Sequence, residues 1–278
     1  MSKVVFHIGL RKTGSSALQE TLSKCDSLLG HYGVNYPARL THFPAHQELA
    51  WSLLEEFDNL PADWRSFDVV ADQYRRQIEG NAVKSLDTII SSEDLSLISF
   101  SFNDLHRFYS AFKEYDPVIF LFERDPVSFH ISNYKHAIVA GREKRNFMDF
   151  TLGVNKIAYA QLGHVASIWE QFFGMDRVLR ASYDDDTRRE KGILWFFLNK
   201  AMGIDIEVDS VERQSNRSIP DSAVEYVLSL NRSELPDADI SRLKDEIQRN
   251  TFNSVKSEGV EAPPYLKNIE FLRSIYSP

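Results

Sequence analysis

Residues 3–22 join an apolar segment to a glycine-bounded turn, and the turn leads into a segment of helical character. The apolar segment is β-branched and aromatic, which is typical of a buried strand. The turn runs from Gly9 to Gly14, and we expect the helix to begin at Ser15. In this layout the backbone N–H groups of the turn and the positive end of the helix dipole point at one spot. The segment therefore predicts a binding site for an anionic group such as a phosphate.

The spacing of the two glycines matches the P-loop pattern G-x-x-x-x-G-K-[ST], but the lysine of that pattern is missing. Ser15 stands in its place and is followed by Ser16. A lysine, Lys12, occurs instead inside the turn beside Arg11. We therefore expect the turn to hold an anionic nucleotide, in a manner that differs from an ATP-hydrolysing P-loop.

Two adjacent cations at a strand end repel each other, and an anion would balance them. The alternative is a plain capped helix after a glycine turn, with Thr13 or Ser15 as the cap. We interpret the turn as a phosphate site, since its hydroxyl, ammonium and backbone amide groups can all hold phosphate oxygens. The predicted nucleotide-binding residues of the turn are Arg11, Lys12, Thr13, Gly14, Ser15 and Ser16.

The bulk composition fits a globular protein and argues against several classes. The 278 residues are 43% hydrophobic, enough for a sizeable core. A formal net charge of −8 argues against a nucleic-acid binder. The single cysteine, Cys25, excludes a disulfide framework and a cysteine-based zinc cluster. The chain enters a strand almost at once, which leaves no signal peptide, and no apolar stretch approaches the roughly 20 residues of a membrane span. We therefore expect a cytoplasmic protein.

Further apolar segments alternate with helical ones along the chain. Strands separated by helices favour parallel pairing with crossover connections. We therefore predict a three-layer α/β fold, a central parallel sheet flanked by helices, in a single domain over residues 1–278. Its nucleotide-binding core is expected over about 1–205 and a helical part over about 206–278. The later strands are predicted at residues 86–92, 117–122 and 177–183.

Parallel sheets bind ligands at the carboxyl ends of their strands, so the polar residues that follow each strand are candidates for a site. After the third strand, Arg124 is followed by Asp125 and Pro126, and Ser132 comes eight residues after the arginine, in the next helix. A guanidinium fork and a hydroxyl suit one phosphate. The alternative is a simple ion pair between Arg124 and a neighbouring carboxylate.

These two motifs resemble those of sulfotransferases that use 3′-phosphoadenosine 5′-phosphosulfate (PAPS). The family carries a Lys-[Thr/Ser]-Gly-[Thr/Ser]-[Thr/Ser] loop after its first strand, which is residues 12–16 here. The resemblance implies a P-loop NTPase-like fold, with Lys12 against the bridging oxygen of the 5′-phosphosulfate. It also implies that Arg124 and Ser132 bind the 3′-phosphate. The order of the motifs is closest to the bacterial and carbohydrate-directed branches.

Two weaker matches extend the resemblance. Tyr183-Asp184-Asp185 is similar to a Tyr-Glu-Asp sequence whose tyrosine touches the adenine in the family. A basic segment, residues 213–218, resembles a late loop that closes over the nucleotide, which implies a role for Arg217. The chain lacks the Arg-Lys-Gly sequence of many cytosolic animal members.

The charge on the reacting groups suggests how such a chain would work. By analogy with phosphoryl transfer, positioning and electrostatic stabilisation supply most of the rate. Lys12 can neutralise the leaving oxygen, and the backbone amides of residues 12–16 can hold the phosphate. We expect PAPS as the co-substrate and no metal ion.

A hydroxyl acceptor needs a base within hydrogen-bond reach. Glu93 follows the second predicted strand directly and is expected to face the same edge as Lys12. Its alternative role is to favour a helix N-terminus by its charge. His46, in the loop after residue 37, is the second candidate, since imidazole titrates in a useful range. Family members use either residue type, so both stay open.

The predicted function is transfer of a sulfuryl group from PAPS to a hydroxyl or amine of a small molecule or glycan. A P-loop kinase of nucleotides or small molecules is an alternative, although it would require a lysine at position 15 and magnesium ligands. A nucleotide-binding module without catalysis is a second alternative. It would be favoured if Glu93 and His46 both lay far from Lys12.

Overall fold

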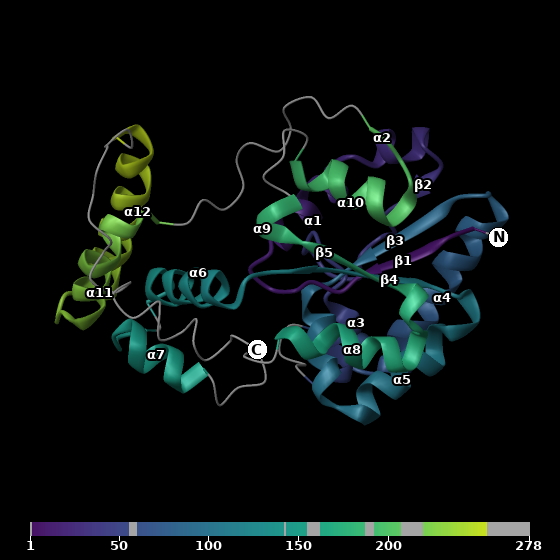
Figure 1. The fold of residues 1–278 in the computed structure, drawn as a ribbon, viewed down its shortest axis with the longest axis horizontal. Coiled ribbons are helices and arrows are strands. Elements are labelled where there is room, and N and C mark those ends of the chain that lie inside the picture. Colours follow the sequence, from purple (N-terminus) through teal and green to yellow (C-terminus); the bar gives the residue numbers. More distant parts are fainter. Residues whose placement is uncertain are drawn as a thin grey trace. The chain divides into compact units, whose positions relative to one another are not determined.

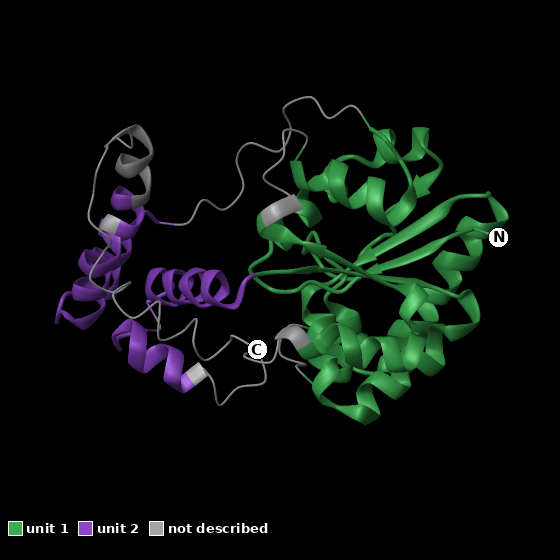
Figure 2. Cartoon of the chain, viewed as in Figure 1, with its two compact units in different colours: residues 1–124, 161–216 green, residues 125–160, 217–278 purple. Residues whose placement is uncertain are grey.

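A computed structural model describes residues 2–55, 60–141, 143–154, 162–186, 192–206 and 219–254. These residues form two compact units (Figure 2). The first comprises residues 1–124 and 161–216, and the second residues 125–160 and 217–278. The boundary that we expected near residue 205 stays a prediction.

Five parallel strands form the sheet of the first unit, in the order β2-β3-β1-β4-β5 (Figure 1). This confirms the predicted α/β class with a central parallel sheet. The register pairs Val5 of β1 with Ile89 of β3 and with Val118 of β4. The strands are β1 (Val4–His7), β2 (Val34–Asn35), β3 (Asp87–Ser91), β4 (Val118–Glu123) and β5 (Val178–Ser182).

Helices cover both faces of this sheet, as the alternation of segments predicts (Figure 1). Helices α1, α2 and α10 lie on one face, and α3, α4, α5 and α8 lie on the other. Their bounds are α1 (Ser15–Lys24), α2 (Asp26–His31), α3 (Glu48–Leu53), α4 (Phe67–Val83), α5 (Phe102–Phe112), α8 (Leu162–Phe173), α9 (Tyr183–Asp186) and α10 (Gly192–Met202). Short 3-10 helices are η2 (Ala62–Trp64), η3 (Glu93–Phe100), η4 (Lys113–Tyr115) and η6 (Met175–Arg177). The helical segment that we expected to begin at Ser15 is divided at Cys25 into α1 and α2.

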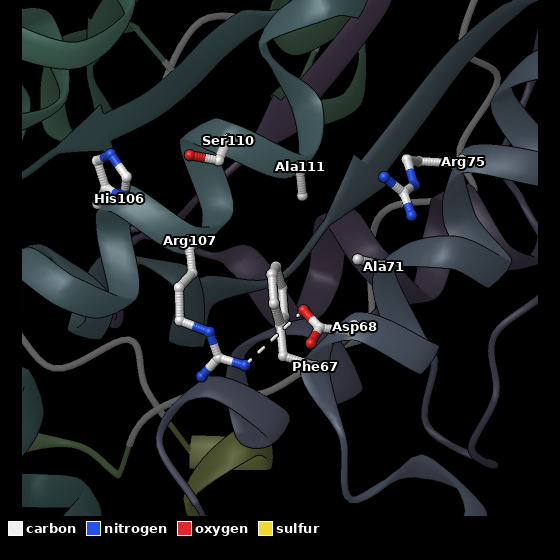
Figure 3. A pocket seen from close by; sticks show the side chains of 8 residues that line it. All are labelled: Phe67, Asp68, Ala71, Arg75, His106, Arg107, Ser110 and Ala111. Atoms are coloured by element: carbon white, nitrogen blue, oxygen red, sulfur yellow. Dashed lines mark ion pairs between the residues drawn. The ribbon is translucent and has the colours of Figure 1, made fainter.

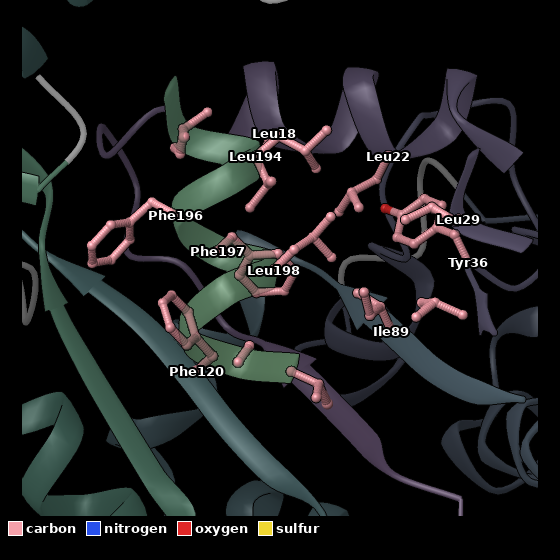
Figure 4. Close-up of a cluster of buried hydrophobic side chains, with 14 of the residues drawn as sticks. Leu18, Leu22, Leu29, Tyr36, Ile89, Phe120, Leu194, Phe196, Phe197 and Leu198 are labelled. Atoms are coloured by element: carbon pink, nitrogen blue, oxygen red, sulfur yellow. The ribbon is translucent and has the colours of Figure 1, made fainter. Parts of the chain in front are cut away.

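Alternate residues of the strands enter the cores on opposite faces of the sheet. Val5, Ile89 and Phe120 belong to one core cluster with side chains of α1 and α10. Figure 4 shows Ile89 and Phe120 in this cluster. Phe6 points to the other face, where its ring lies 5.0 Å from that of Phe108 on α5. Burial on both faces explains why these strands have continuous apolar sequences rather than alternating ones.

The second unit is helical. Its helices are α6 (Pro126–Val139), α7 (Phe147–Val154), η7 (Asp221–Ala223), α11 (Val224–Arg232) and α12 (Asp237–Ser254). Side chains of α6, α7 and α11, among them Tyr134, Phe147 and Val227, form its apolar core. The Asp125 carboxylate caps α6 by accepting a 2.8 Å hydrogen bond from the Ser128 amide, and Pro126 occupies the first turn. The sequence analysis did not predict α7.

Within the described residues, no helix combines the length and apolarity that a bilayer span requires.

Candidate functional site

The turn after β1 is held between the ends of β3 and β4. The Leu10 amide donates to Phe122 O at 3.0 Å, and the Phe122 amide donates to Gly9 O at 2.7 Å. On the other side, the Ser92 amide donates to His7 O at 2.9 Å. These bonds continue the parallel ladders beyond β1. They bring the residues that follow three neighbouring strands to one edge of the sheet.

Both glycines of the turn are required by close contacts. Gly9 has φ +112°, and a Cβ there would lie 3.2 Å from the backbone oxygen of Glu93. Gly14 has φ +74°, and a Cβ there would lie 2.8 Å from Cε2 of Tyr183. Positive φ and close neighbours both favour glycine. The turn therefore lies directly against the segments that follow β3 and β5.

Two side-chain hydroxyl groups donate hydrogen bonds to a backbone oxygen within the turn. Thr13 Oγ1 donates to Leu10 O at 2.5 Å, and Ser15 Oγ donates to the same oxygen at 3.0 Å. Both side chains are buried, whereas Ser16 is half-buried at the start of α1. Thr13 and Ser15 thus shape the loop, and their phosphate contacts stay predictions.

Lys12 stands at the tip of the turn with φ +64° and is half-buried. Burial lowers the pKa of its ammonium from 10.5 to about 8, because the charged form loses hydration. The negative charge of Glu93 opposes this decrease, and the positive charges of Arg11 and Arg124 add to it. An anion bound beside Lys12 would favour the protonated amine.

Arg124 follows β4 and reaches the same turn. Its Nη1 donates to the backbone oxygen of Lys12 at 2.6 Å, and its Nε lies 3.5 Å from Asp184 Oδ1. The guanidinium carbon lies 5.2 Å from the ring centre of Tyr183. Nε is buried and makes no hydrogen bond within the described residues. Such a donor has hydrogen-bonding capacity left for a ligand.

Glu93 begins η3 directly after β3 and is half-buried. Burial and the neighbouring carboxylate of Asp94 raise its pKa, while Arg11, Lys12 and the Ser15 hydroxyl oppose that increase. The Ser15 hydroxyl has one proton, which it can give either to Leu10 O or to the Glu93 carboxylate. Glu93 and Lys12 therefore interact electrostatically at this edge of the sheet, and the catalytic role of Glu93 stays a prediction.

Arg11 already has an anionic partner in the protein. Its Nε and Nη2 donate to Asp94 Oδ1 at 2.9 and 2.5 Å, and Asp94 Oδ2 accepts a 2.9 Å bond from Trp51 Nε1. Asp94 therefore balances the charge of Arg11, and a bound anion is expected to balance Lys12 more than Arg11. We had predicted no role for either Asp94 or Trp51 from the sequence. The one sequence feature that pointed to the Arg11–Asp94 contact is the position of the Asp94 carboxylate directly after Glu93.

His46 lies in the core and is fully buried. Its Nδ1 accepts a 3.0 Å bond from the Ser91 amide, and its Nε2 lies 3.1 Å from Pro37 O. Tyr36 and Tyr74 pack edge-on against the ring. Burial lowers its pKa to about 4. The structure therefore does not bring His46 to the edge that holds Lys12 with a ring nitrogen free for proton transfer.

The remaining predicted residues lie in three places. Tyr183 begins α9 after β5 and contacts Gly14 and Arg124, within the same unit as the turn. Ser132 lies on α6 of the second unit, so its part in the site stays a prediction. Arg217 lies outside the described residues.

A surface pocket of about 280 Å³ lies between α4 and α5, and none of the predicted site residues lines it (Figure 3). Arg107 there pairs with Asp68 at 4.0 Å and covers the ring of Phe67. The other arginine of the pocket, Arg75, pairs with Asp72 at 3.3 Å. Both arginines are thus paired with local carboxylates, and we do not assign the site to this pocket.

The arrangement at the sheet edge joins two cations, Lys12 and Arg124, with the carboxyl of Glu93. The cations suit an anionic ligand with two charged groups, and the carboxyl suits a proton acceptor. No group of three metal-ligating side chains occurs among the residues that the structure describes.

Comparisons with known proteins support the fold. No protein-family model matches the sequence, and no curated protein matches it. Among solved structures, a sulfotransferase from Alicyclobacillus acidocaldarius is similar at 16% identity and a TM-score of 0.51, over 91% of this chain and 100% of that one. A sulfotransferase domain from the curacin biosynthetic pathway matches at 12% identity and a TM-score of 0.42, over 100% of this chain and 99% of that one. The chain therefore shares its fold with a sulfotransferase, as its two motifs predicted.

Proposed function

We propose that this chain transfers a sulfuryl group from PAPS to a hydroxyl or amine of a small-molecule or glycan acceptor. The observation that carries the proposal is the 2.6 Å hydrogen bond from Arg124 to the backbone of Lys12. It joins the two motifs that resemble the PAPS-dependent family, although they lie 112 residues apart. The shared fold with a sulfotransferase supports the same function.

The residues present suit this co-substrate. PAPS supplies an activated sulfuryl group on a phosphate and carries a second phosphate on its ribose. Lys12 offers a half-buried ammonium, and Arg124 offers a buried Nε without a hydrogen bond in the described part of the chain. The turn adds backbone amides between Lys12 and Ser16. Cations and amides together are the groups that bind phosphate and sulfate oxygens.

Lys12 is proposed to act as an electrostatic catalyst. Its protonated Nζ would stabilise the negative charge that develops on the leaving oxygen, which is a common way for a fixed cation to lower a barrier. The nearby charge of Glu93 favours the protonated amine. The left-handed backbone at Lys12, held by Arg124, orients the residue before any ligand binds.

Glu93 is proposed to act as the base. A carboxylate whose pKa is raised toward the working pH takes up a proton more effectively than an ordinary one. Burial and Asp94 raise the pKa of Glu93 in this way. We prefer Glu93 to His46, because both ring nitrogens of His46 are occupied by backbone groups.

The remaining contacts follow the family resemblance. Arg124 is proposed to bind the 3′-phosphate together with Ser132, and Tyr183 the adenine. Arg217 is proposed to close over the nucleotide. The carboxylate of Asp184, 3.5 Å from Arg124 Nε, would then share the guanidinium with the ligand.

Thermal-shift measurements separate this proposal from its alternatives. Adenosine 3′,5′-bisphosphate is expected to raise the melting temperature more than ATP with magnesium, because a ligand selective for the folded state stabilises it. The reverse order would favour a kinase. Transfer of radiolabelled sulfate from PAPS onto a panel of acceptors then tests catalysis. Binding of the bisphosphate without transfer to any acceptor would favour a module that only binds.

A further inference from the structure

One buried carboxylate outside the proposed reaction holds three donors at the site. The Asp94 side chain is 5% exposed, and the partners of its two oxygens are Arg11 and Trp51. Arg11 comes from the turn after β1, Asp94 from η3 and Trp51 from α3. The carboxylate therefore ties three separate segments at one point.

The two charged partners are sequence neighbours of the proposed catalytic groups. Arg11 precedes Lys12, and Asp94 follows Glu93. The turn after β1 and the start of η3 also pack closely, since a Cβ on Gly9 would lie 3.2 Å from the backbone oxygen of Glu93. A shift of either segment would change the separation between the ammonium and the carboxyl group.

We propose that Arg11 and Asp94 are positioning residues, whose ion pair fixes Lys12 and Glu93 in the arrangement that transfer requires. The inference rests on the proposed function. Trp51 completes the contact, because its indole N–H occupies the second carboxylate oxygen and anchors the pair to α3. The Arg11 guanidinium thus has a structural role, through its bonds to Asp94, that does not depend on a bound ligand.

Asp94→Asn tests the pair, since asparagine keeps the shape and one acceptor oxygen but loses the charge. We expect kcat to fall by about 10- to 100-fold, as it does when reacting groups are displaced by about 1 Å. The dissociation constant of adenosine 3′,5′-bisphosphate, measured by calorimetry, is expected to stay within about threefold of the wild-type value. The reason is that the pair is proposed to act on the transition state and not on the binding of the nucleotide itself. Arg11→Lys keeps the charge without the two-donor fork and is expected to lower kcat as well.

Asp72→Asn is the matched control, because Asp72 also pairs with two arginines, Arg75 and Arg76, but on the exposed part of α4. We expect this variant to behave as the wild type. Equal kcat in Asp94→Asn, Arg11→Lys and Asp72→Asn would overturn the positioning role.

The pH profile gives a signature that a purely structural contact would not produce. Asp94 raises the pKa of Glu93 and Arg11 lowers it, with Lys12 and Ser15 as the other neighbours that act on it. In a plot of kcat/KM against pH, the rise on the acid side reports the loss of the Glu93 proton. This acid limb is therefore expected to move to lower pH in Asp94→Asn and to higher pH in Arg11→Gln. Limbs that do not move, or that move in the same direction, would contradict the inference.

Hydrogen exchange tests the pair even without turnover. Asp94→Asn is expected to speed amide exchange both in residues 9–16 and in residues 91–96, while Asp72→Asn leaves them unchanged. Faster exchange in Asp94→Asn, combined with a wild-type protein that shows no sulfuryl transfer, would overturn the proposed function alone. Unchanged exchange in both segments would overturn the positioning role alone.

Discussion

The guanidinium of Arg124 donates a 2.6 Å hydrogen bond to the backbone oxygen of Lys12. The two residues follow neighbouring strands, β4 and β1, which pair in parallel. Because parallel strands end at the same edge, residues distant in sequence meet where ligands bind. This contact links the loop that would hold the reacting end of a nucleotide to the group that would hold its other end.

Lys12→Ala is expected to lower sulfuryl transfer by about 100- to 1000-fold, the usual effect of removing one group that stabilises developing charge. Lys24→Ala is the matched control, since Lys24 is 69% exposed at the end of α1. Rates are measured with radiolabelled PAPS. Turnover in Lys12→Ala equal to that of the control would exclude the leaving-group role.

Arg124→Ala is expected to weaken the binding of adenosine 3′,5′-bisphosphate by about 10- to 100-fold, because a charge-assisted contact contributes about 1.5–3 kcal/mol. Adenosine 5′-phosphosulfate lacks the 3′-phosphate, so its affinity is expected to change much less. Arg180→Ala on the adjacent strand β5 serves as the control. Equal losses for both nucleotides in Arg124→Ala would show that Arg124 does not recognise the 3′-phosphate.

The pH dependence of kcat/KM is expected to be bell-shaped. Activity rises as Glu93 loses its proton, above the usual carboxylate range because its pKa is raised. Activity then falls as Lys12 loses its proton near its pKa of about 8. Glu93→Gln is expected to remove the acid limb. It also moves the alkaline limb to lower pH, since the charge of Glu93 raises the pKa of Lys12.

Persistence of the acid limb in Glu93→Gln would assign the proton uptake to another group.

Gly14→Ala is expected to destabilise the fold by more than the roughly 1–2 kcal/mol of a left-handed alanine, because its Cβ also meets Tyr183. Gly203→Ala is the matched control, since Gly203 has φ +75° and no atom within 4 Å of its Cβ position. Urea unfolding measures both. Equal losses in the two variants would show that the ring of Tyr183 gives way at no cost.

His46 is expected to make the fold sensitive to mild acid. Its folded-state pKa of about 4 lies below the unfolded value of 6.5, so the unfolded chain binds the proton first as the pH falls. Stability is therefore lost from about pH 6.5 downward, by about 2 kcal/mol at pH 5. His46→Asn is expected to reduce this loss between pH 7 and pH 5 in urea unfolding.

His42→Asn, at an exposed side chain of the same loop, is the control. If His46→Asn abolished transfer while the folded state was kept, the histidine would return as a candidate base.

The strand-turn-helix at the N-terminus and the arginine after the third predicted strand could be recognised from the sequence because both are local patterns. Apolar β-branched segments predicted β1, β3, β4 and β5 close to their observed bounds. Helix α7 escaped, because short apolar segments such as Phe147–Val154 look alike in helices and strands.

Side-chain partners could not be predicted in the same way. Asp94 lies 83 residues from Arg11, and the order β2-β3-β1-β4-β5 decides that they meet. The burial of His46 depends on the rings of Tyr36, which directly follows β2, and of Tyr74 on α4.

The sequence by itself determined which chemical groups follow each strand, since strand periodicity and turn residues act over a few positions. Tertiary structure alone decided which cationic side chain pairs with which carboxylate. It paired the carboxylate of Asp94 with Arg11, and it brought Arg124, whose Nε makes no hydrogen bond within the described residues, to the backbone of Lys12. The reason is physical: charge pairing depends on distances of a few ångströms, which only the packing of the strands sets.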